Sequence, residues 1–253
     1  MRIVLLSKVP RWYSFRADRV VQRLADDSHE VVAVVAERCA TLASLREWML
    51  KFGPRLFAEK SVQKLRRQLR WGRASQGEGV PASRLSAGGA IPPVHWVDSH
   101  NSAACVELVR QLRPDVLILR GCGILKRSIL EIPRLGAINP HYAFLPAYRG
   151  VDVTEWAALH GDPMAVSVHQ VTEQVDIGTV LASQRISAEP GDTVGRLRDK
   201  SAAAAVELLT AALAKLDSGA ALPVPLMITA GRQYFAMHPR LRQLTELRLK
   251  RAC

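Results

Sequence analysis

The 253-residue chain carries 35 Lys and Arg against 23 Asp and Glu, a net charge of +12, and 48% of its residues are hydrophobic. This length supports a full hydrophobic core, and no apolar run approaches the roughly 20 residues of a membrane-spanning helix. The four cysteines are scattered without a CxxC pair, so no metal site is expected. The basic charge indicates an anionic partner without choosing among nucleic acid, anionic lipid and phosphorylated or carboxylated small molecules.

The first forty residues predict a parallel sheet. Residues 2–7 (RIVLLS) and 30–36 (EVVAVVA) are typical of buried strands, and residues 14–29 between them carry apolar positions at helical spacing. A strand, a helix and a second strand form a βαβ unit. The opening run stops at Lys8 and Pro10, so we interpret it as a strand and not as a signal peptide, and we expect a cytoplasmic protein. No G-x-G-x-x-G follows this strand, so no nicotinamide cofactor is expected.

A basic segment interrupts the sheet pattern after residue 41. Residues 42–73 predict two helices with Lys and Arg on their polar faces, and a Gly-, Ser-, Ala- and Pro-rich loop follows. We interpret residues 42–92 as a helical, basic insertion within one α/β domain. Solvated surface helices are the simpler interpretation, and a contact with RNA or a membrane surface is the alternative.

From residue 94 onward, apolar strands alternate with helical patterns. Strands are expected at 94–98, within 114–123 before a glycine turn, at 137–142, at 165–171 and within 176–193, and helices at 101–115, 124–136, 153–162 and 194–219. This order predicts an open, mostly parallel, Rossmann-like α/β sheet flanked by helices. We assign residues 1–219 to this domain and residues 220–253, a strand followed by a basic helix, to a short C-terminal extension.

Three polar residues form a candidate reaction centre. Asn139 and His141 lie two residues apart at the end of a strand, so their side chains share a face. Ligands bind at the carboxyl ends of parallel strands. An Asn amide can donate to an oxygen that gains charge, and a His can move a proton near neutral pH. Asp176 is the best candidate for a carboxylate partner, because it lies in a turn between two strands with Gly178 two residues on.

The motifs around these residues resemble those of the folate-dependent formyltransferases. NPHYAFLPAYRG (139–150), VHQVTEQVDIGTVL (168–181) and EPGDT (189–193) match, in order, the family pattern of Asn-x-His, a Leu-Pro segment ending in Arg/Lys-Gly, and a Val-Asp-x-Gly turn. The resemblance covers residues 94–215 well and the first βαβ unit loosely. It implies transfer of a formyl group from 10-formyltetrahydrofolate to an amine.

The resemblance also implies roles for individual residues. Asn139 and a protonated His141 would stabilise the developing oxyanion, and Asp176 would keep His141 charged and oriented. The folate cleft would be lined by Arg120, Gly121, Cys122, Gly123, Ile124, Leu125, Val175 and Gly178. The substrate would contact Tyr148, Arg149 and Gly150, although Arg149 is equally typical of a structural clamp on loop carbonyls.

Other conspicuous residues have plainer interpretations. Trp156 is interpreted as a core residue, because it lies on a helix after the motif. The remaining histidines with no matching ligand spacing are interpreted as structural or surface residues; they are His95, His100, His160 and His169.

Departures from the family pattern limit the range of substrates that we expect. Ala143 stands where the family commonly has Ser, and Pro140 stands where an aliphatic residue is usual, which could change the direction of Asn139. The first strand is not followed by the phosphate-binding glycine loop of the purine branch, and we expect no C-terminal barrel of the initiator-tRNA branch. We therefore expect a small, anionic amine substrate, no nucleic-acid partner and no membrane span, with a homodimer possible.

Two classes of function remain open. The favoured one is N-formylation of an amino sugar linked to a nucleotide diphosphate, with another amine such as hydroxyornithine as the enzymatic alternative. The other class is a non-catalytic module that binds RNA or a membrane surface, which predicts salt-dependent binding and indifference to folate.

Overall fold

The structure, a computed structural model, describes residues 1–8, 15–37, 92–219 and 231–251. The predicted basic helices of residues 42–73 lie outside the described residues, as does nearly all of the loop that was expected to end at residue 92.

The central element is a seven-stranded sheet with the order β3-β2-β1-β4-β5-β7-β8. Its strands are β1 (Arg2–Ser7), β2 (Glu30–Glu37), β3 (Val94–Val97), β4 (Val116–Arg120), β5 (Ala137–His141), β7 (Met164–Gln170) and β8 (Val180–Ile186). The strands from β3 to β5 in this order pair in parallel, whereas β7 is antiparallel to β5 and β8 is antiparallel to β7. The predicted open, mostly parallel, Rossmann-like sheet is confirmed.

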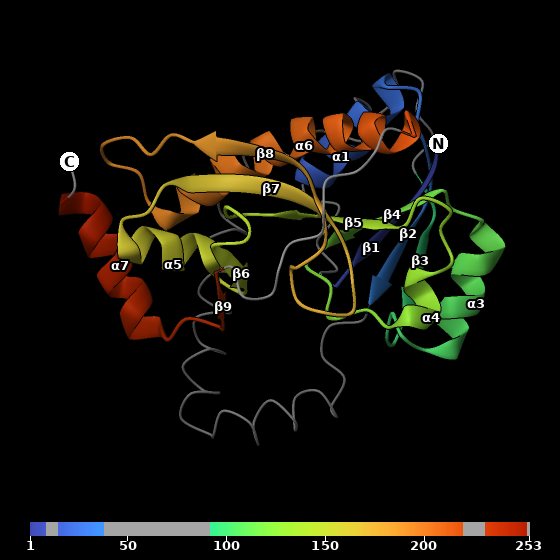
Figure 1. Cartoon of the computed structure of the whole chain (residues 1–253), viewed down its shortest axis with the longest axis horizontal. Helices are drawn as coiled ribbons and strands as arrows, with labels where there is room; N and C mark the ends of the chain where they lie inside the picture. Colours follow the sequence, from blue (N-terminus) through green and yellow to red (C-terminus); the bar gives the residue numbers. More distant parts are fainter. Residues whose placement is uncertain (9–14, 38–91, 220–230, 252–253) are drawn as a thin grey trace.

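Helices cover both faces of this sheet (Figure 1). α1 (Phe15–Asp26) and α6 (Val194–Asp217) pack on one face, and α3 (Ala103–Leu112) and α4 (Arg127–Leu130) pack on the other. Alternate residues of β1 therefore serve two cores, because Ile3 and Leu5 face α1 and α6 while Val4 and Leu6 face α3 and α4. A parallel strand covered on both faces is buried along its length, which explains the near-continuous apolar run at the start of the chain.

The helix boundaries follow from capping residues. The Ser102 hydroxyl accepts a hydrogen bond from the Cys105 amide at 3.2 Å and begins α3, and the Thr193 hydroxyl does the same for α6. α5 (Val153–His160) ends at Gly161, whose φ of +79° is the left-handed conformation that glycine adopts most readily.

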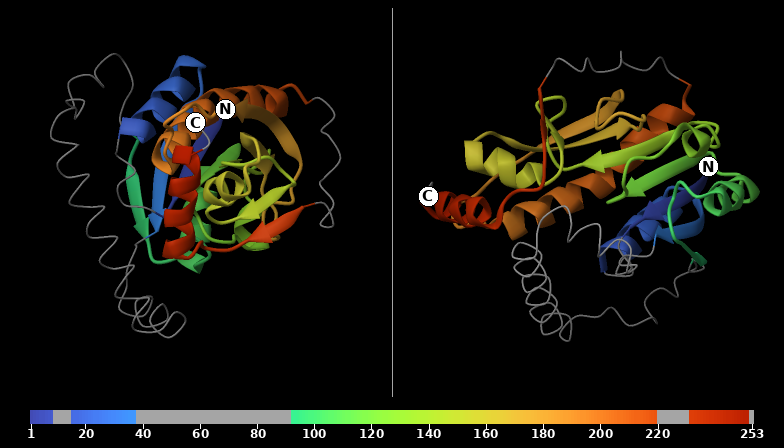
Figure 2. Two further views of the ribbon diagram at one scale, coloured as in Figure 1. Left: turned by 90° about the vertical axis from the view of Figure 1, so that its left-hand side faces the viewer. Right: turned by 90° about the horizontal axis from the view of Figure 1, so that it is seen from below.

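A smaller layer lies beside the carboxyl end of β5 and the amino end of β7. It consists of α5, the short strands β6 (Tyr148–Gly150) and β9 (Arg232–Tyr234), and α7 (Pro239–Arg251), and the strands β6 and β9 pair in parallel (Figure 2). The indole Nε1 of Trp156 on α5 donates to the Phe235 carbonyl just after β9 at 2.8 Å, and the Trp156 ring lies 5.3 Å from that of Tyr234. The C-terminal extension is thus tied to the domain through α5 and β6.

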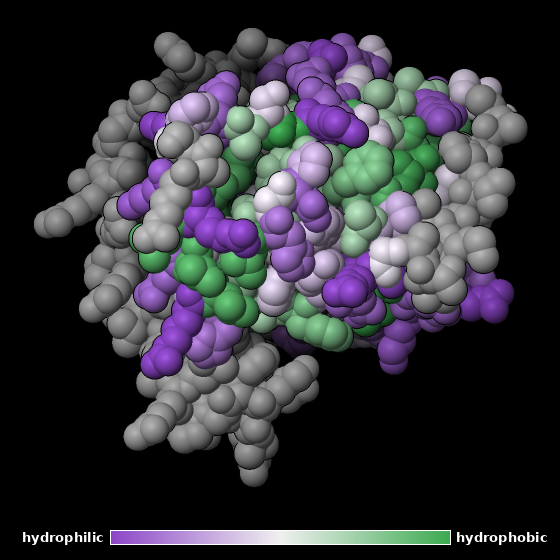
Figure 3. Space-filling model, turned by 60° about the vertical axis from the view of Figure 1, so that its left-hand side comes forward, coloured by the Kyte–Doolittle hydropathy of each residue, from purple (hydrophilic) through white to green (hydrophobic). Residues whose placement is uncertain are grey.

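This end of the molecule presents a mixed surface. Figure 3 brings it forward and shows hydrophobic side chains interspersed with hydrophilic ones. Across the described residues, no helix combines the length and the apolar character needed to cross a membrane.

Candidate active site

Three neighbouring elements bring the predicted reaction centre together. The antiparallel register of β5 and β7 sets Asn139 opposite His169 and His141 opposite Ser167. Asp176 lies in the turn between β7 and β8, and its carboxylate reaches the imidazoles of His141 and His169. Pro140 is buried within β5 without interrupting it, so Asn139 and His141 keep their common direction.

His141 is held by a hydrogen bond from one ring nitrogen, and its other ring nitrogen faces Asp176. Its Nε2 donates to the Tyr148 carbonyl oxygen at 2.7 Å, and its Nδ1 lies 3.5 Å from Asp176 Oδ2. The side chain is only 5% exposed, and this burial lowers the pKa of His141 although Asp176 acts in the opposite direction. The structure therefore favours a neutral His141 near pH 7, whereas the sequence led us to expect a charged one.

Asp176 lies between the two imidazoles. Its φ of +51° is a left-handed conformation, which aspartate tolerates better than most residues. One oxygen, Oδ2, accepts a hydrogen bond from the Gly150 amide at 2.7 Å, and the other, Oδ1, lies 3.4 Å from His169 Nε2. Burial alone would raise the pKa of Asp176, but His169, His141 and the Gly150 amide outweigh it and lower this pKa. Asp176 is therefore ionised at neutral pH.

His169 belongs to the site and was missed in the sequence, where it was interpreted as a structural or surface residue. It is 2% exposed, and its Nδ1 donates to the Gln170 carbonyl oxygen at 2.7 Å. Its Nε2 lies 3.3 Å from the Asn139 amide nitrogen and 3.4 Å from Asp176 Oδ1, so it can accept from Asn139 when it carries a lone pair and donate to Asp176 when it carries a proton. The signal that identifies His169 is the antiparallel pairing of β5 with β7, which sets His169 opposite Asn139 and which no local motif indicates.

At two glycines, Gly150 and Gly178, backbone segments approach each other closely beside the candidate catalytic residues. A Cβ on Gly178 would overlap the Gln170 carbonyl oxygen, and a Cβ on Gly150 would overlap the Tyr234 carbonyl oxygen. Gly150 also has a φ of +102°, which only glycine adopts without strain. Glycine at position 150 thus lets β9 pair closely with β6, beside the amide that donates to Asp176.

The residues predicted to line a folate cleft fall into three groups. The turn of Arg120 to Gly123 follows β4, the strand next to β5, and nothing lies within 4 Å of a Cβ built on Gly121 or Gly123. Ile124 is 61% exposed, whereas Leu125 is 1% exposed and packs in the core beneath α3 and α4. Val175 and Gly178 flank Asp176.

The Cys122 thiol is not suited to act as a nucleophile. Burial raises the pKa of the Cys122 thiol to about 12, so the group stays protonated at neutral pH. Cys122 lies in the turn after β4, where a small side chain suffices. Across the described residues, no cluster of His, Cys, Asp and Glu has the arrangement of a metal site.

The residues predicted to contact the substrate have mixed positions. Tyr148 is 6% exposed, its ring stacks on Tyr234 at 4.9 Å, and its hydroxyl hydrogen-bonds with Asp162 and with His160 Nδ1. Its side chain is thus part of an aromatic cluster, and it is the Tyr148 carbonyl that reaches His141. Arg149 is also buried, and Gly150 contributes its amide to Asp176.

A separate hollow of about 640 Å³ lies at the opposite end of β4. Arginine side chains contribute to its lining, among them Arg113 and Arg134, and Arg134 pairs with Asp115 at 3.2 Å. It is remote from the carboxyl ends of the strands, so we attribute no part of the candidate chemistry to it.

The sequence of the chain is similar to those of known proteins. The family model described as formyl transferase matches residues 1–213. A methionyl-tRNA formyltransferase of Myxococcus xanthus (strain DK1622) is 34% identical over 156 residues, which cover 61% of this chain and 50% of that protein. The chain spans about half the length of the curated relatives it matches.

Solved structures share the fold at low sequence identity. Glycinamide ribonucleotide transformylase 1 from Symbiobacterium toebii superposes with a TM-score of 0.58 at 18% identity, over 84% of this chain and 85% of that chain. A sugar N-formyltransferase from Shewanella sp FDAARGOS_354 superposes with a TM-score of 0.59 at 14% identity, over 98% of this chain and 87% of that chain.

Proposed function

Because this chain belongs to the formyl transferase family, we propose that it is a folate-dependent N-formyltransferase, with 10-formyltetrahydrofolate as the formyl donor. The observation that carries the proposal is the convergence of Asn139, His141 and Asp176 at the carboxyl end of the sheet, where His169 joins them. An amide donor, a neutral imidazole and an ionised carboxylate in one buried cluster supply what acyl transfer to an amine requires.

The proposed roles follow from the protonation states. The Asn139 amide donates to the formyl oxygen as that oxygen gains negative charge, and His169 fixes the direction of the amide. The attacking nitrogen bonds to the formyl carbon and loses a proton, which the pair of Asp176 and His141 accepts. The pair returns this proton to N10 of the folate as the bond between N10 and the formyl carbon breaks. Asp176 stabilises the imidazolium form of His141 while it exists.

The residues near this cluster suit a folate. 10-Formyltetrahydrofolate supplies the formyl carbon when it is bound. The Gly121–Gly123 turn leaves its backbone open, and the exposed Ile124 offers apolar contact for a flat ring system. The net charge of +12 favours an anionic folate tail. Leu125 takes no direct part in this proposal, because its side chain is in the core.

For the acceptor, we favour the amine of a nucleotide-linked amino sugar. The likeness to the sugar N-formyltransferase fold extends over 98% of this chain and so includes the C-terminal extension, whereas the likeness to the glycinamide ribonucleotide enzyme extends over 84%. The basic charge also suits a diphosphate. An aliphatic amine such as hydroxyornithine remains the alternative small-molecule acceptor.

Methionyl-tRNA is a second candidate acceptor. The relatives with 34–35% identity are methionyl-tRNA formyltransferases, and the basic charge of this chain suits RNA as well as a diphosphate. The absence of a nucleic-acid partner, which the sequence led us to expect, is therefore not part of the proposal.

A formylation panel tests the proposal and separates the acceptors. The protein is incubated with 10-formyltetrahydrofolate and, separately, with amino-sugar nucleotides, hydroxyornithine and methionyl-tRNA, and mass spectrometry detects the gain of one formyl group. His141→Ala serves as the inactive variant, and His95→Ala on β3 serves as its matched control, because β3 is at the far edge of the sheet. Failure of every acceptor together with failure to bind folate would reject the transferase and favour the binding module.

Three further expectations stay predictions. They are the division into a catalytic domain of residues 1–219 and an extension of residues 220–253, a cytoplasmic location, and a homodimer. Size-exclusion chromatography with light scattering tests the last of these.

A further inference from the structure

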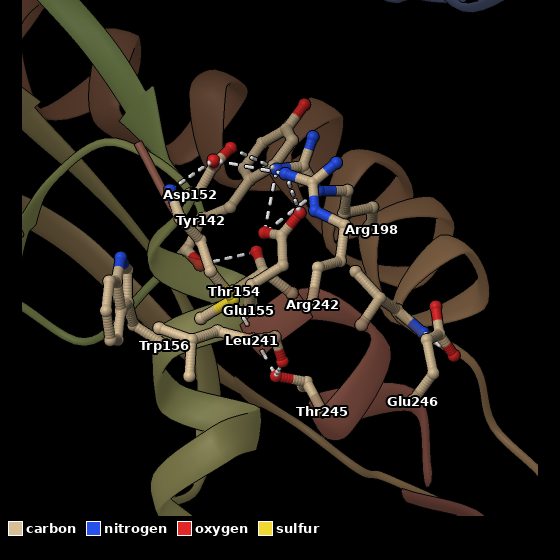
Figure 4. A network of polar contacts seen from close by, with 12 residues as sticks. Tyr142, Asp152, Thr154, Glu155, Trp156, Arg198, Leu241, Arg242, Thr245 and Glu246 are labelled. Atoms are coloured by element: carbon tan, nitrogen blue, oxygen red, sulfur yellow. Dashed lines mark hydrogen bonds and ion pairs between the residues drawn. The ribbon is translucent and has the colours of Figure 1, made fainter. Parts of the chain in front are cut away.

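Four charged side chains form a compact network between α5, α6 and α7 (Figure 4). Asp152 and Glu155 supply the carboxylates, and Arg198 on α6 and Arg242 on α7 supply the guanidinium groups. The Glu155 side chain is 1% exposed, so its charge depends on these two partners.

Each arginine contacts both carboxylates. Arg198 Nη2 lies 3.1 Å from Asp152 and 2.7 Å from Glu155, and Arg242 Nη2 lies 3.1 Å from Asp152 and 2.9 Å from Glu155. The Met237 amide adds a hydrogen bond to Asp152 Oδ2 at 3.0 Å. Asp152 is therefore fixed from two sides, by the domain through α6 and by the C-terminal extension through Met237 and α7.

Asp152 is also the end of the segment that borders the candidate active site. Along residues 148–152, the Tyr148 carbonyl accepts from His141 at 2.7 Å and the Gly150 amide donates to Asp176 at 2.7 Å. The next amide, that of Val151, donates to the Tyr234 carbonyl of β9 at 3.0 Å. One short segment thus contacts two reacting side chains on one side and the C-terminal extension on the other.

We propose that Arg242 is a positioning residue, which holds the 148–152 segment against His141 and Asp176 through its ion pairs with Asp152 and Glu155. The inference deepens the proposed function, on which its catalytic readout rests. Arg242 touches no reacting group. It acts through Asp152, and the C-terminal extension thereby becomes part of the machinery that prepares the site.

Through Asp152, Arg242 acts together with Arg198 and the Met237 amide to hold the Gly150 amide in place. Asp176 faces His141 from β5, His169 from β7 and the Gly150 amide from β6. If the 148–152 segment shifts, the Asp176 carboxylate still faces His141 and His169 but loses the hydrogen bond from the Gly150 amide. The carboxylate is then less well placed to stabilise the charge that develops on His141. A displacement of about 1 Å in such a site lowers turnover by up to a hundredfold.

Arg242→Gln is the principal test, and Arg240→Gln is its matched control, because Arg240 is an exposed residue of the same helix whose side chain is outside the network. We expect Arg242→Gln to lower kcat ten- to a hundredfold with little change in KM for the amine. We expect Arg242→Lys to restore part of this loss, because an ammonium keeps the charge but lacks the planar fork of a guanidinium. Arg240→Gln is expected to match the wild type.

A second readout separates positioning from simple stability. The Asp176 carboxyl carbon is titrated by NMR in the wild type and in both Gln variants. In Arg242→Gln the pKa of Asp176 rises, because the Gly150 amide no longer stabilises the carboxylate, and the acid limb of the kcat profile moves to higher pH. Loss of attachment of α7 alone would lower the melting temperature without moving this titration.

The outcomes decide between the two claims. A folded Arg242→Gln protein with wild-type kcat and a wild-type Asp176 titration overturns the positioning role. If the wild type transfers no formyl group to any acceptor, the proposed function fails, and the NMR comparison still decides whether Arg242 positions the segment.

Discussion

Replacement of Asp176 by Asn removes one charge while it keeps the shape of the side chain. The carbonyl of the new amide can still accept from the Gly150 amide, which lies 2.7 Å from Oδ2. What is lost is the attraction between the carboxylate and an imidazolium whose Nδ1 lies 3.5 Å away. Two unit charges at that distance, with an effective dielectric constant of about 20, attract by about 5 kcal/mol. If the imidazolium forms only during the reaction, kcat falls roughly 3,000- to 5,000-fold.

The assay is single-acceptor formylation at saturating donor, with the acceptor that the panel identifies. Asp217→Asn makes the same chemical change on an exposed carboxylate at the end of α6 and is expected to leave kcat unchanged. The His141 ring, followed by NMR, is expected to show a lower pKa in Asp176→Asn, because the carboxylate raises this pKa in the wild type. A folded Asp176→Asn protein with kcat within a factor of three of the wild type, about 0.7 kcal/mol, would refute the reasoning.

Three other perturbations test separate parts of the structure. Gly178→Ala is expected to lower the free energy of unfolding by at least about 2 kcal/mol in urea titrations, because its Cβ would overlap the Gln170 carbonyl oxygen. Gly195→Ala within α6 should instead raise this free energy by up to about 1 kcal/mol. Equal effects of the two substitutions would contradict the steric argument. His169→Leu should lower kcat at least about tenfold with KM nearly unchanged, because the side-chain amide of Asn139 loses its hydrogen-bond acceptor. Kinetics indistinguishable from the wild type would show that His169 has no part in the site. Folding lowers the pKa of Asp176, so its contribution to stability is present at neutral pH and is lost as pH falls below about 5 toward the folded pKa. Asp176→Asn should therefore flatten the acid side of the plot of unfolding free energy against pH. Parallel plots for the wild type and Asp176→Asn would argue against an ionised carboxylate.

Much of the fold could be predicted because its signals are local. The apolar runs of β1, β2 and β4, the cap at Ser102 and the glycine that ends α5 each depend on a few adjacent residues. The convergence of Asn139 and His141 with a turn carboxylate follows from strand parity and from the carboxyl-end rule.

What could not be predicted depends on contacts between distant residues. β6 has three residues and one of them is glycine, so it carries no strand pattern of its own, and it exists because Arg232–Tyr234 pairs with it. His169 and the neutral state of His141 depend on the antiparallel register and on burial, neither of which is visible in a motif. The four-charge network likewise joins residues from three helices.

The contact between Trp156 and the C-terminal extension has a practical consequence for spectroscopy. The indole of Trp156 hydrogen-bonds to the Phe235 carbonyl at 2.8 Å and lies 6.1 Å from the His160 ring. Its emission should shift to longer wavelength when the extension detaches and water reaches the ring. A variant with phenylalanine at the other four tryptophan positions, 12, 48, 71 and 96, would make this indole a single optical reporter. Rapid-mixing fluorescence could then time the docking of the last strand and helix relative to the formation of the sheet.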